Sequence, residues 1–381
     1  MKSLYHQDMY NFNQPVKSYW ESTNPEIKFE SEILENDDKF DIVVIGGGYS
    51  GLSCSLELAK RFHRNVAVIE AGHIGWGSSA RNGGFLCMGP TKLSLSQLIK
   101  RYGMNEIKHY YKDQIDGSNF TKQLIKEHSI ECDVVGNLNY EVAHHPSFTK
   151  SIKEYANDIS NYFKIKTKFY SKEEFNYVGH TGLEQFGAIS YEPGCALNPL
   201  KLLVGLANAN YENKVKLYSH SKVINVEKNN NDFLIITEKG TIKAKKIVFT
   251  TNGFYRDEII NDYKYRIIPA ISNIIVTRPL SENELNEYNF KTMNPILNAR
   301  NLLFYYRLLP DHRLLFGARG DLSGSKISSL KMSKWIEKRL KQIFPKWADV
   351  NIDFRWSGFV AVTRKLTPSI GKLDDKEIYH S

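Results

Sequence analysis

The sequence predicts an α/β fold that opens with a Rossmann-like unit and continues into a second, strand-rich region. A β-branched run at 40–45 leads directly into the glycine-rich segment 46–51 and then into apolar positions at helical spacing. A second apolar run at 65–70 completes a strand, turn, helix and strand within about 30 residues. Strand patterns dominate again at 263–320. A chain of 381 residues suits about two domains.

The other expected elements follow in chain order. Residues 1–38 are polar and predict an extended arm rather than a packed element. Residues 96–130 show helical patterning. The compact unit at 40–70 has no place for further helices without an added layer, so we expect residues 96–130 to begin the second region. Further helices are expected at 199–209 and 331–344, and further strands at 215–217, 223–226, 233–237, 246–253, 271–277, 301–309 and 313–316.

Composition excludes several functional classes. Lys and Arg total 51 and Asp and Glu 42, but the positive charges are scattered at strand and helix spacings, which favours solvated faces over a nucleic-acid partner. No stretch is apolar enough to predict a membrane span. The cysteines form no C-x-x-C pair and predict free thiols in a cytoplasmic protein, with neither disulfides nor a metal site: Cys54, Cys87, Cys132 and Cys195.

The glycine turn predicts dinucleotide binding. Gly46 permits the tight turn, Gly48 lets the backbone approach a pyrophosphate, and Gly51 lets the helix pack on the strand. The N-terminus of the helix offers amides and partial positive charge to phosphate. Glu70 ends the second strand, where a carboxylate accepts ribose hydroxyls. No Arg lies near Glu70, which favours FAD or NAD over NADP.

The loop at 75–84 favours FAD over NAD. It holds four glycines, two hydroxyl side chains, an arginine and an asparagine, directly after the ribose-binding strand. Such a loop can follow an anionic ligand closely, and a simple NAD-binding fold has no need of it. A surface loop rich in small residues is the alternative interpretation.

These motifs also resemble a known family. The segments 46–52, 70–71 and 74–84, together with 18–20, 305–307, 313–317 and 364–371, resemble the FAD-dependent amine and amino-acid oxidases (the D-amino acid oxidase-like family) and their gamma-glutamylputrescine oxidase branch. The resemblance spans about residues 17–379. It implies a Rossmann-like FAD-binding domain interleaved with a substrate domain built on a large antiparallel sheet.

The resemblance also implies domain boundaries and site residues. After an arm at 1–38, the FAD-binding domain would comprise 39–100, 185–262 and 355–381, and the substrate domain 101–184 and 263–354. Tyr306 and Arg307 are the catalytic candidates; Arg307 could hold a substrate carboxylate. Alternation along the strand would send Tyr306 to one face and Tyr305 with Arg307 to the other. The implied cofactor-binding residues are Gly46, Gly48, Tyr49, Ser50, Gly51, Glu70, Ala71, Gly77, Ser78, Ser79, Arg81, Asn82, Gly83, Gly84, Val223, Thr251, Asn252 and Gly253.

The implied reaction is oxidation of the carbon–nitrogen bond of a small amine. The amine carbon transfers hydride to flavin N5, the imine hydrolyses, and oxygen or another acceptor takes the electrons. An amino-acid or N-methylglycine-type oxidase is the alternative within the same cofactor class. The sequence does not predict an oligomeric state.

The resemblance departs from the family at the C-terminus. Family members continue into a glycine-rich turn and a helix whose N-terminus faces the flavin, whereas this sequence ends at Ser381. We therefore expect weakened flavin binding or low turnover. A truncated, non-catalytic dinucleotide-binding relic is the alternative of another class.

Overall fold

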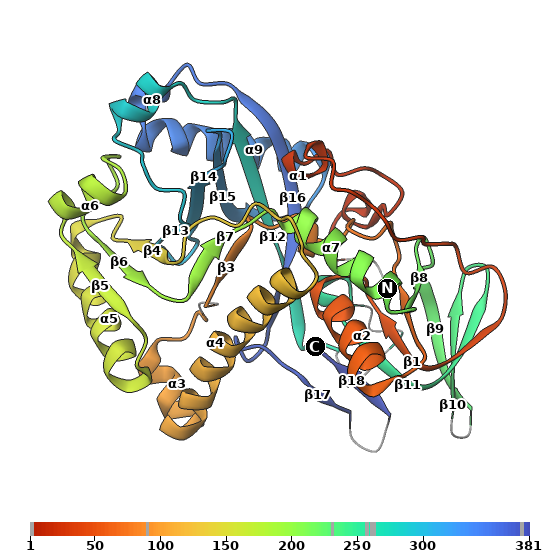
Figure 1. The fold of residues 1–381 in the computed structure, drawn as a ribbon. Helices are drawn as coiled ribbons and strands as arrows, with labels where there is room; N and C mark the ends of the chain where they lie inside the picture. Colours follow the sequence, from red (N-terminus) through yellow and green to blue (C-terminus); the bar gives the residue numbers. More distant parts are fainter. Residues whose placement is uncertain (1–3, 89–90, 230–231, 256–258, 260–263, 374–376) are drawn as a thin grey trace.

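A computed structural model describes residues 4–88, 91–229, 232–255, 259, 264–373 and 377–381. Within these residues the chain forms two large sheets joined by helices and by a two-stranded ribbon (Figure 1). The Rossmann-like fold and the antiparallel-sheet fold expected from the sequence are both present. The predicted domain boundary at residues 262 and 263 lies outside the described residues.

The first sheet is the Rossmann-like one, with the strand order β17-β18-β11-β1-β2-β8. Its central strands β11, β1, β2 and β8 are parallel, as is β18 beside β11, whereas β17 is antiparallel to β18. Strands β10 and β9 extend it as an antiparallel ribbon from β11. The bounds are β1 (Asp38–Ile45), β2 (Val66–Ile69), β8 (Lys216–Tyr218), β9 (Val223–Asn229), β10 (Asp232–Thr237), β11 (Thr241–Phe249), β17 (Gly371–Lys372) and β18 (Ile378–His380).

Helices α2 (Tyr49–Phe62) and α7 (Pro199–Glu212) cover one face of this sheet. Successive residues of β1 point to opposite faces, so Val44 packs under these helices while Val43 packs against the β9–β11 side. The two helices are also joined by buried polar groups, since Ser55 Oγ lies 2.6 Å from Asn210 Oδ1. The small Ser55 side chain thus lets α7 approach α2 directly behind the glycine turn.

The second sheet has the strand order β16-β12-β15-β14-β13-β4-β6-β5. Neighbouring strands within this sheet are antiparallel, except that β13 and β4 are parallel. The bounds are β4 (Asn139–Val142), β5 (Thr167–Tyr170), β6 (Ala188–Tyr191), β12 (Ile267–Thr277), β13 (Ile296–Asn298), β14 (Phe304–Leu308), β15 (Leu314–Asp321) and β16 (Ile352–Thr363).

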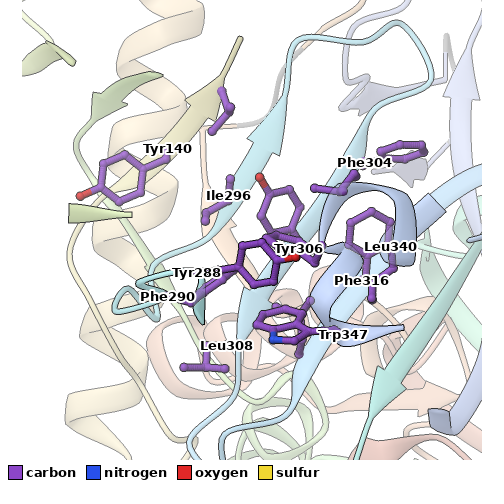
Figure 2. Packing of buried hydrophobic residues seen from close by; sticks show 14 of the residues in the cluster. Tyr140, Tyr288, Phe290, Ile296, Phe304, Tyr306, Leu308, Phe316, Leu340 and Trp347 are labelled. Carbon is purple, nitrogen blue, oxygen red and sulfur yellow. The ribbon is translucent and has the colours of Figure 1, made fainter. Parts of the chain in front are cut away.

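The two faces of the second sheet pack against different helices. One face lies under α9 (Lys326–Ile343), and there Tyr306, Phe316 and Trp347 belong to an aromatic core (Figure 2). The other face packs partly against the helices between β3 and β6. The remaining helices are α1 (Tyr19–Ser22), α3 (Leu95–Tyr102), α4 (Met104–Glu127), α5 (Thr149–Phe163), α6 (Lys172–Val178) and α8 (Glu282–Glu287).

Short elements complete the described chain. The two-stranded ribbon joins β3 (Phe85–Cys87) to β7 (Gly194–Ala196). The 3-10 turns are η1 (Gln7–Tyr10), η2 (Ser78–Ala80), η3 (Pro146–Phe148), η4 (Asn252–Phe254) and η6 (Pro345–Trp347). Among the residues described, no helix is both long and apolar enough to cross a membrane.

The N-terminal arm differs from its prediction as an unpacked segment. Trp20 is 1% exposed, and its Nε1 donates to the carbonyl of Asn82 at 2.9 Å. Trp76 Nε1 donates likewise to the carbonyl of Gln14. Apolar side chains scattered through a polar segment thus hold the arm against the loop at 75–84.

Two strands pair outside their predicted region. Both β6 and β16 belong to the second sheet, although the expected boundaries put their residues wholly or largely in the FAD-binding domain. In both cases the chain stays in the second sheet beyond the residue at which the FAD-binding domain was expected to resume, 185 for β6 and 355 for β16. The division into domains remains a prediction.

Candidate cofactor and substrate site

The glycine turn is built by contacts that only glycine allows. Gly46 has φ +114°, and a Cβ there would lie 2.7 Å from the carbonyl oxygen of Thr250. A Cβ on Gly51 would lie 2.0 Å from the carbonyl oxygen of Gly46. Thr250 Oγ1 donates to that same Gly46 oxygen at 2.9 Å. The ends of β1 and β11 therefore meet the start of α2 backbone to backbone.

The N-terminus of α2 faces the loop at 77–84. Gly48 is the N-cap and supplies no side chain to cap the helix. The amide of Tyr49 donates to Ser79 Oγ at 3.0 Å, whereas the Tyr49 hydroxyl turns away to the carbonyl of Pro199. Ser50 is exposed in the first turn. Tyr49 was predicted to bind the cofactor; in the structure its backbone amide, and not its ring, faces the loop at 77–84.

Glu70 lies at the carboxyl end of β2, next to the glycine turn. Its carboxylate accepts from the amides of Gly47 at 2.8 Å and Gly72 at 3.0 Å. Burial raises the pKa of Glu70 above its ordinary value, while these amides act against that rise. Ala71, beside Glu70, is half-buried.

The segment that leads to Val223 runs alongside Glu70. The amide of Ser221 donates to the carbonyl of Glu70 at 2.9 Å, and that of His220 to the carbonyl of Gly72 at 2.8 Å. Val223 starts β9 and is buried in the core beside β2. The strand that begins with Val223, an implied cofactor-binding residue, is thus adjacent to Glu70, the predicted ribose-binding residue.

Asn82 holds the shape of the loop at 77–84. Its Nδ2 donates to the carbonyl of Ser79 at 2.7 Å, and its Oδ1 accepts from the amide of Gly84 at 2.7 Å. Gly84 has φ +72°, and a Cβ there would lie 2.0 Å from the carbonyl oxygen of Leu197. At Gly77, in contrast, an added Cβ would meet nothing within 4 Å.

Arg81 fastens this loop to the second sheet. Its Nε donates to the carbonyl of Trp76 at 2.7 Å, and its Nη1 to the carbonyl of Ser357 on β16 at 3.2 Å. The guanidinium lies 4.0 Å from the centroid of the Trp76 ring. Burial lowers the pKa of Arg81 to about 10, so it stays charged at neutral pH. Arg81 therefore orients the loop and contributes positive charge beside it.

The turn after β11 brings the third group of predicted residues to the same region. Thr251 is the N-cap of η4 (Asn252–Phe254), and Asn252 has φ +50°. Gly253 is buried, and a Cβ there would lie 3.0 Å from Phe359 Cβ on β16. The turn thus follows directly on Thr250, which closes the glycine turn.

A cavity of about 170 Å³ lies between this loop and the second sheet. Ser78 and Gly83 line it from the loop, and Tyr305 and Arg319 line it from strands β14 and β15. The full lining is Ser78, Arg81, Asn82, Gly83, Ser272, Ile274, Tyr305, Arg319, Gly358, Phe359 and Val360. A Cβ on Gly83 would lie 3.3 Å from the Tyr305 ring. Most of the loop's predicted residues therefore share one cavity with the face of the sheet.

Tyr306, predicted as catalytic, does not reach this cavity. Its hydroxyl lies 2.8 Å from His180 Nε2, inside the aromatic core on the opposite face (Figure 2). The alternation of β14 decides this, because neighbouring residues of a strand face opposite ways. Tyr305, which faces the other way, lines the cavity, and its hydroxyl lies 2.7 Å from Ser272 Oγ.

Arg307 shares the face of Tyr305, as alternation predicted, but it is not a lining residue of the cavity. It is 1% exposed, and its Nη2 donates to the carbonyl of Leu197 at 2.7 Å. A Cβ on Gly84 would lie 2.8 Å from this Nη2. Trp20 of the arm covers the guanidinium, whose Cζ is 5.3 Å from the ring centroid. Arg307 thus supports the Gly84 turn and is not placed to bind a carboxylate in the cavity.

Sequence reasoning missed Ser272 and Arg319. The Nε of Arg319 is buried and has no hydrogen-bond partner in the described structure. Both residues lie opposite each other on β12 and β15. The only sequence signal was the strand pattern itself. Arg319 comes beside Tyr305 through the pairing of the consecutive strands β14 and β15, and Ser272 comes beside Arg319 through a pairing of residues 47 positions apart.

The residues present fit a dinucleotide cofactor. Gly48, the N-cap of α2, supplies no side chain to the first turn, which suits a pyrophosphate, as helix N-termini do. Ser78 Oγ lines the cavity and is buried without a partner in the described structure. Glu70 follows β2 directly and accepts from the amide of Gly47 in the glycine turn, the position of the acidic residue in dinucleotide-binding folds. These groups therefore fit an adenine dinucleotide.

Comparison with known proteins also indicates a dinucleotide cofactor. Residues 41–381 match the family described as "DAO: FAD dependent oxidoreductase". A gamma-glutamylputrescine oxidoreductase of Escherichia coli (strain K12) is 28% identical over 363 residues, which cover 95% of this chain and 82% of the relative. The "Probable oxidoreductase OrdL" of Haemophilus influenzae is 26% identical over 367 residues, with the same coverage of both chains.

The fold has solved counterparts. Glycine oxidase from Geobacillus kaustophilus superposes with a TM-score of 0.71 at 17% identity, over 90% of this chain and 88% of that one. The family match spans most of the sequence, including the glycine turn, the loop at 77–84 and the strands that line the cavity. The chain belongs to the family of FAD-dependent oxidoreductases.

Proposed function

We propose that this enzyme oxidises the carbon–nitrogen bond of a small amine in the cavity between the loop at 77–84 and the second sheet. The observation that carries the proposal is the composition of that cavity. Its loop side presents Ser78 and Gly83, which the family resemblance assigns to the cofactor, and its sheet side presents Tyr305 and Arg319. The similarity to a gamma-glutamylputrescine oxidoreductase supports an amine substrate.

The cofactor would be held by the residues described above. The turn of Gly46, Gly48 and Gly51 would take the pyrophosphate, Glu70 the ribose, and the loop at 77–84 the flavin half. Val223 and the turn at 251–253 would border the adenine side. When bound, FAD supplies the hydride acceptor at N5 and passes the electrons to oxygen or another acceptor.

Tyr305 and Ser272 would orient the amine. Burial raises the pKa of Tyr305 to about 12, so its hydroxyl stays protonated at neutral pH and can donate a hydrogen bond. Ser272 Oγ, 2.7 Å away, fixes that hydroxyl. A neutral amine nitrogen is a good acceptor for such a donor.

Arg319 would favour the neutral form of the reacting amine. Its positive charge disfavours an ammonium in the same cavity, because like charges lower the pKa of an amine. Hydride leaves the carbon of a neutral amine, since the nitrogen lone pair must stabilise the developing imine. Hydrolysis of the imine then gives an aldehyde and an amine or ammonia.

One experiment tests this proposal. The purified enzyme is saturated with FAD and mixed without oxygen with a panel of primary and secondary alkylamines, while the visible absorbance of the flavin is followed. We expect the absorbance to bleach with at least one amine and to return on exposure to oxygen or to an added acceptor. Bound flavin that no member of the panel reduces would overturn the proposal.

A second candidate is oxidation of an amino acid or an N-methylglycine-type substrate. The unpaired, buried Nε of Arg319 favours it, since a guanidinium binds a carboxylate through two parallel hydrogen bonds. Glycine and N-methylglycine in the same panel separate the candidates. If these alone bleach the flavin, the alkylamine proposal is wrong.

We also propose a cytoplasmic location. All four cysteines are free thiols, two of them buried, and disulfides are uncommon where the compartment is reducing. Fractionation of cells that express the tagged protein tests this location.

A further inference from the structure

The strand pairing places a carboxylate on the same face of the second sheet as Tyr305. Leu297 of β13 lies opposite Tyr305 of β14 on one side and opposite Glu141 of β4 on the other. Residues paired across neighbouring strands point to the same face. Since each step between strands is about 4.8 Å, the Cα atoms of Glu141 and Tyr305 are about 10 Å apart.

The surroundings of Glu141 are polar and aromatic. Tyr111 of α4 and Tyr155 of α5 meet through their hydroxyls at 3.3 Å. Tyr191 of β6 is paired with Asn139 of β4 and so points to the same face as Glu141. Burial raises the pKa of all three tyrosines, and the negative charge of Glu141 raises each further. Tyrosine rings and a carboxylate together form an environment suited to an organic cation.

A second observation indicates an incomplete polar site here. Asn139 lies two residues before Glu141 on β4 and therefore points to the same face. It is fully buried, and neither its Oδ1 nor its Nδ2 has a hydrogen-bond partner in the described structure. A buried amide with both ends unpaired costs free energy unless a ligand or water completes it.

Glu141 itself is partly accessible and not committed to a partner. Within the described residues, Lys92 is the charge that acts on Glu141, and no ion pair shorter than 4.0 Å joins them. Lys92 Nζ instead donates to the carbonyl of Asn301. Burial raises the pKa of Glu141 to about 6 and Lys92 opposes the rise, so the carboxylate is mainly ionised at neutral pH.

We propose that Glu141 is a specificity-determining residue that binds a second positive charge on the amine substrate. The carboxylate would accept from an ammonium, and Tyr111, Tyr155 and Tyr191 would surround it. Asn139 would complete the polar contacts beside it. This inference rests on the proposed amine oxidation, which it deepens by naming the substrate class as amines with two cationic groups.

The spacing suits a short diamine. Three bonds of an extended chain span at most about 3.6 Å, so the five bonds between the nitrogens of 1,4-diaminobutane span about 6 Å. A hydrogen bond of about 2.9 Å at each nitrogen extends this reach to about 12 Å, which spans the separation of about 10 Å between the two residues. One nitrogen at Tyr305 would thus leave the other within reach of Glu141. Arg319 would keep the reacting nitrogen neutral, while Glu141 would keep the distal one charged, against the opposing charge of Lys92.

Equilibrium binding tests the inference with two probes, 1,4-diaminobutane and n-butylamine, which differ in the second charge. Isothermal titration calorimetry on the FAD-saturated enzyme gives both dissociation constants without any need for turnover. The variants are Glu141→Gln and, as a control with the same change in charge, Glu154→Gln on exposed α5. Anaerobic bleaching of the flavin is recorded on the same samples.

We expect the wild type to bind the diamine at least tenfold more tightly than n-butylamine. Glu141→Gln should weaken diamine binding by about tenfold to a hundredfold, the range for a hydrogen bond to a charged group, and leave n-butylamine unchanged. Glu154→Gln should change neither.

The possible outcomes separate this inference from the proposed function. Equal affinity of the wild type for both probes, or a preference that survives in Glu141→Gln, overturns the inference even if amines bleach the flavin. A diamine preference that Glu141→Gln abolishes supports the inference. If the flavin stays oxidised in the same samples, the proposed amine oxidation is wrong, but the proposed cation-binding role of Glu141 is still supported.

Discussion

The contact between Gly51 and Gly46 allows a sharp prediction for Gly51→Ala. The added Cβ would lie 2.0 Å from Gly46 O and 2.8 Å from Thr250 Oγ1. An ordinary C···O contact needs about 3.3 Å, so the backbone would have to move by more than about 1 Å. The Gly46 oxygen cannot retreat freely, because Thr250 Oγ1 donates to it. The added Cβ would therefore clash with backbone atoms that cannot easily move.

The magnitude follows from two opposing effects. Overpacking of this kind costs about 1–3 kcal/mol, and the rigid backbone favours the upper end. Replacing glycine in a helix by alanine returns about 1 kcal/mol. We expect the free energy of unfolding to fall by about 2 kcal/mol. The affinity for FAD should fall as well, because the turn that approaches the pyrophosphate is displaced.

Gly117→Ala is the matched control. Gly117 lies in α4, and a Cβ there would meet nothing within 4 Å beyond the helix itself. This variant should gain about 0.5–1 kcal/mol from helix propensity alone. Urea unfolding followed by tryptophan fluorescence measures both, and the midpoint should drop by roughly 0.5 M for Gly51→Ala. Equal midpoints for the two variants would refute the steric reasoning.

The remaining predictions concern the ribose carboxylate and the buried histidine. Glu70→Gln should weaken FAD binding by about tenfold. Each carboxylate oxygen of Glu70 accepts from one backbone amide, Gly47 or Gly72, and the NH₂ group of Gln cannot replace one of these oxygens. Quenching of flavin fluorescence measures the affinity, and an unchanged affinity would show that Glu70 does not belong to the cofactor site. Burial lowers the pKa of His180 to about 3, so the unfolded chain binds a proton that the folded chain excludes, and stability is lost as pH falls from about 6.5 to 3. The double variant His180→Phe with Tyr306→Phe should flatten that part of the stability profile; the same slope in the variant would show that His180 does not cause it.

The glycine turn was predictable because its determinants are local. A buried strand, three spaced glycines and a helix specify one backbone path, and the acid at position 70 follows at the end of the next strand. The structure supplies what the pattern alone could not, namely that Thr250 from a distant strand closes the turn. Local patterns thus predicted the glycine turn but not its distant support.

The substrate side was less predictable, since it depends on long-range pairing. Alternation along β14 separated Tyr305 from Tyr306, but it could not say which face meets the loop. Only the packing of α9 over Tyr306 decides that. The register of the paired strands places Arg319 and Glu141 on the same face as Tyr305. Glu141 is more than 100 residues from Tyr305 in the sequence.

The most direct test of the account compares Tyr305→Phe with Tyr306→Phe. Each variant removes one hydroxyl from neighbouring positions of β14, and the two hydroxyls lie on opposite faces of the sheet. The measurement is the rate of anaerobic flavin reduction by an amine that bleaches the wild type. We predict that Tyr305→Phe slows reduction by about tenfold or more, while Tyr306→Phe leaves the rate within about twofold of the wild type. Slower reduction in Tyr306→Phe alone would contradict the placement of the substrate against the face of Tyr305.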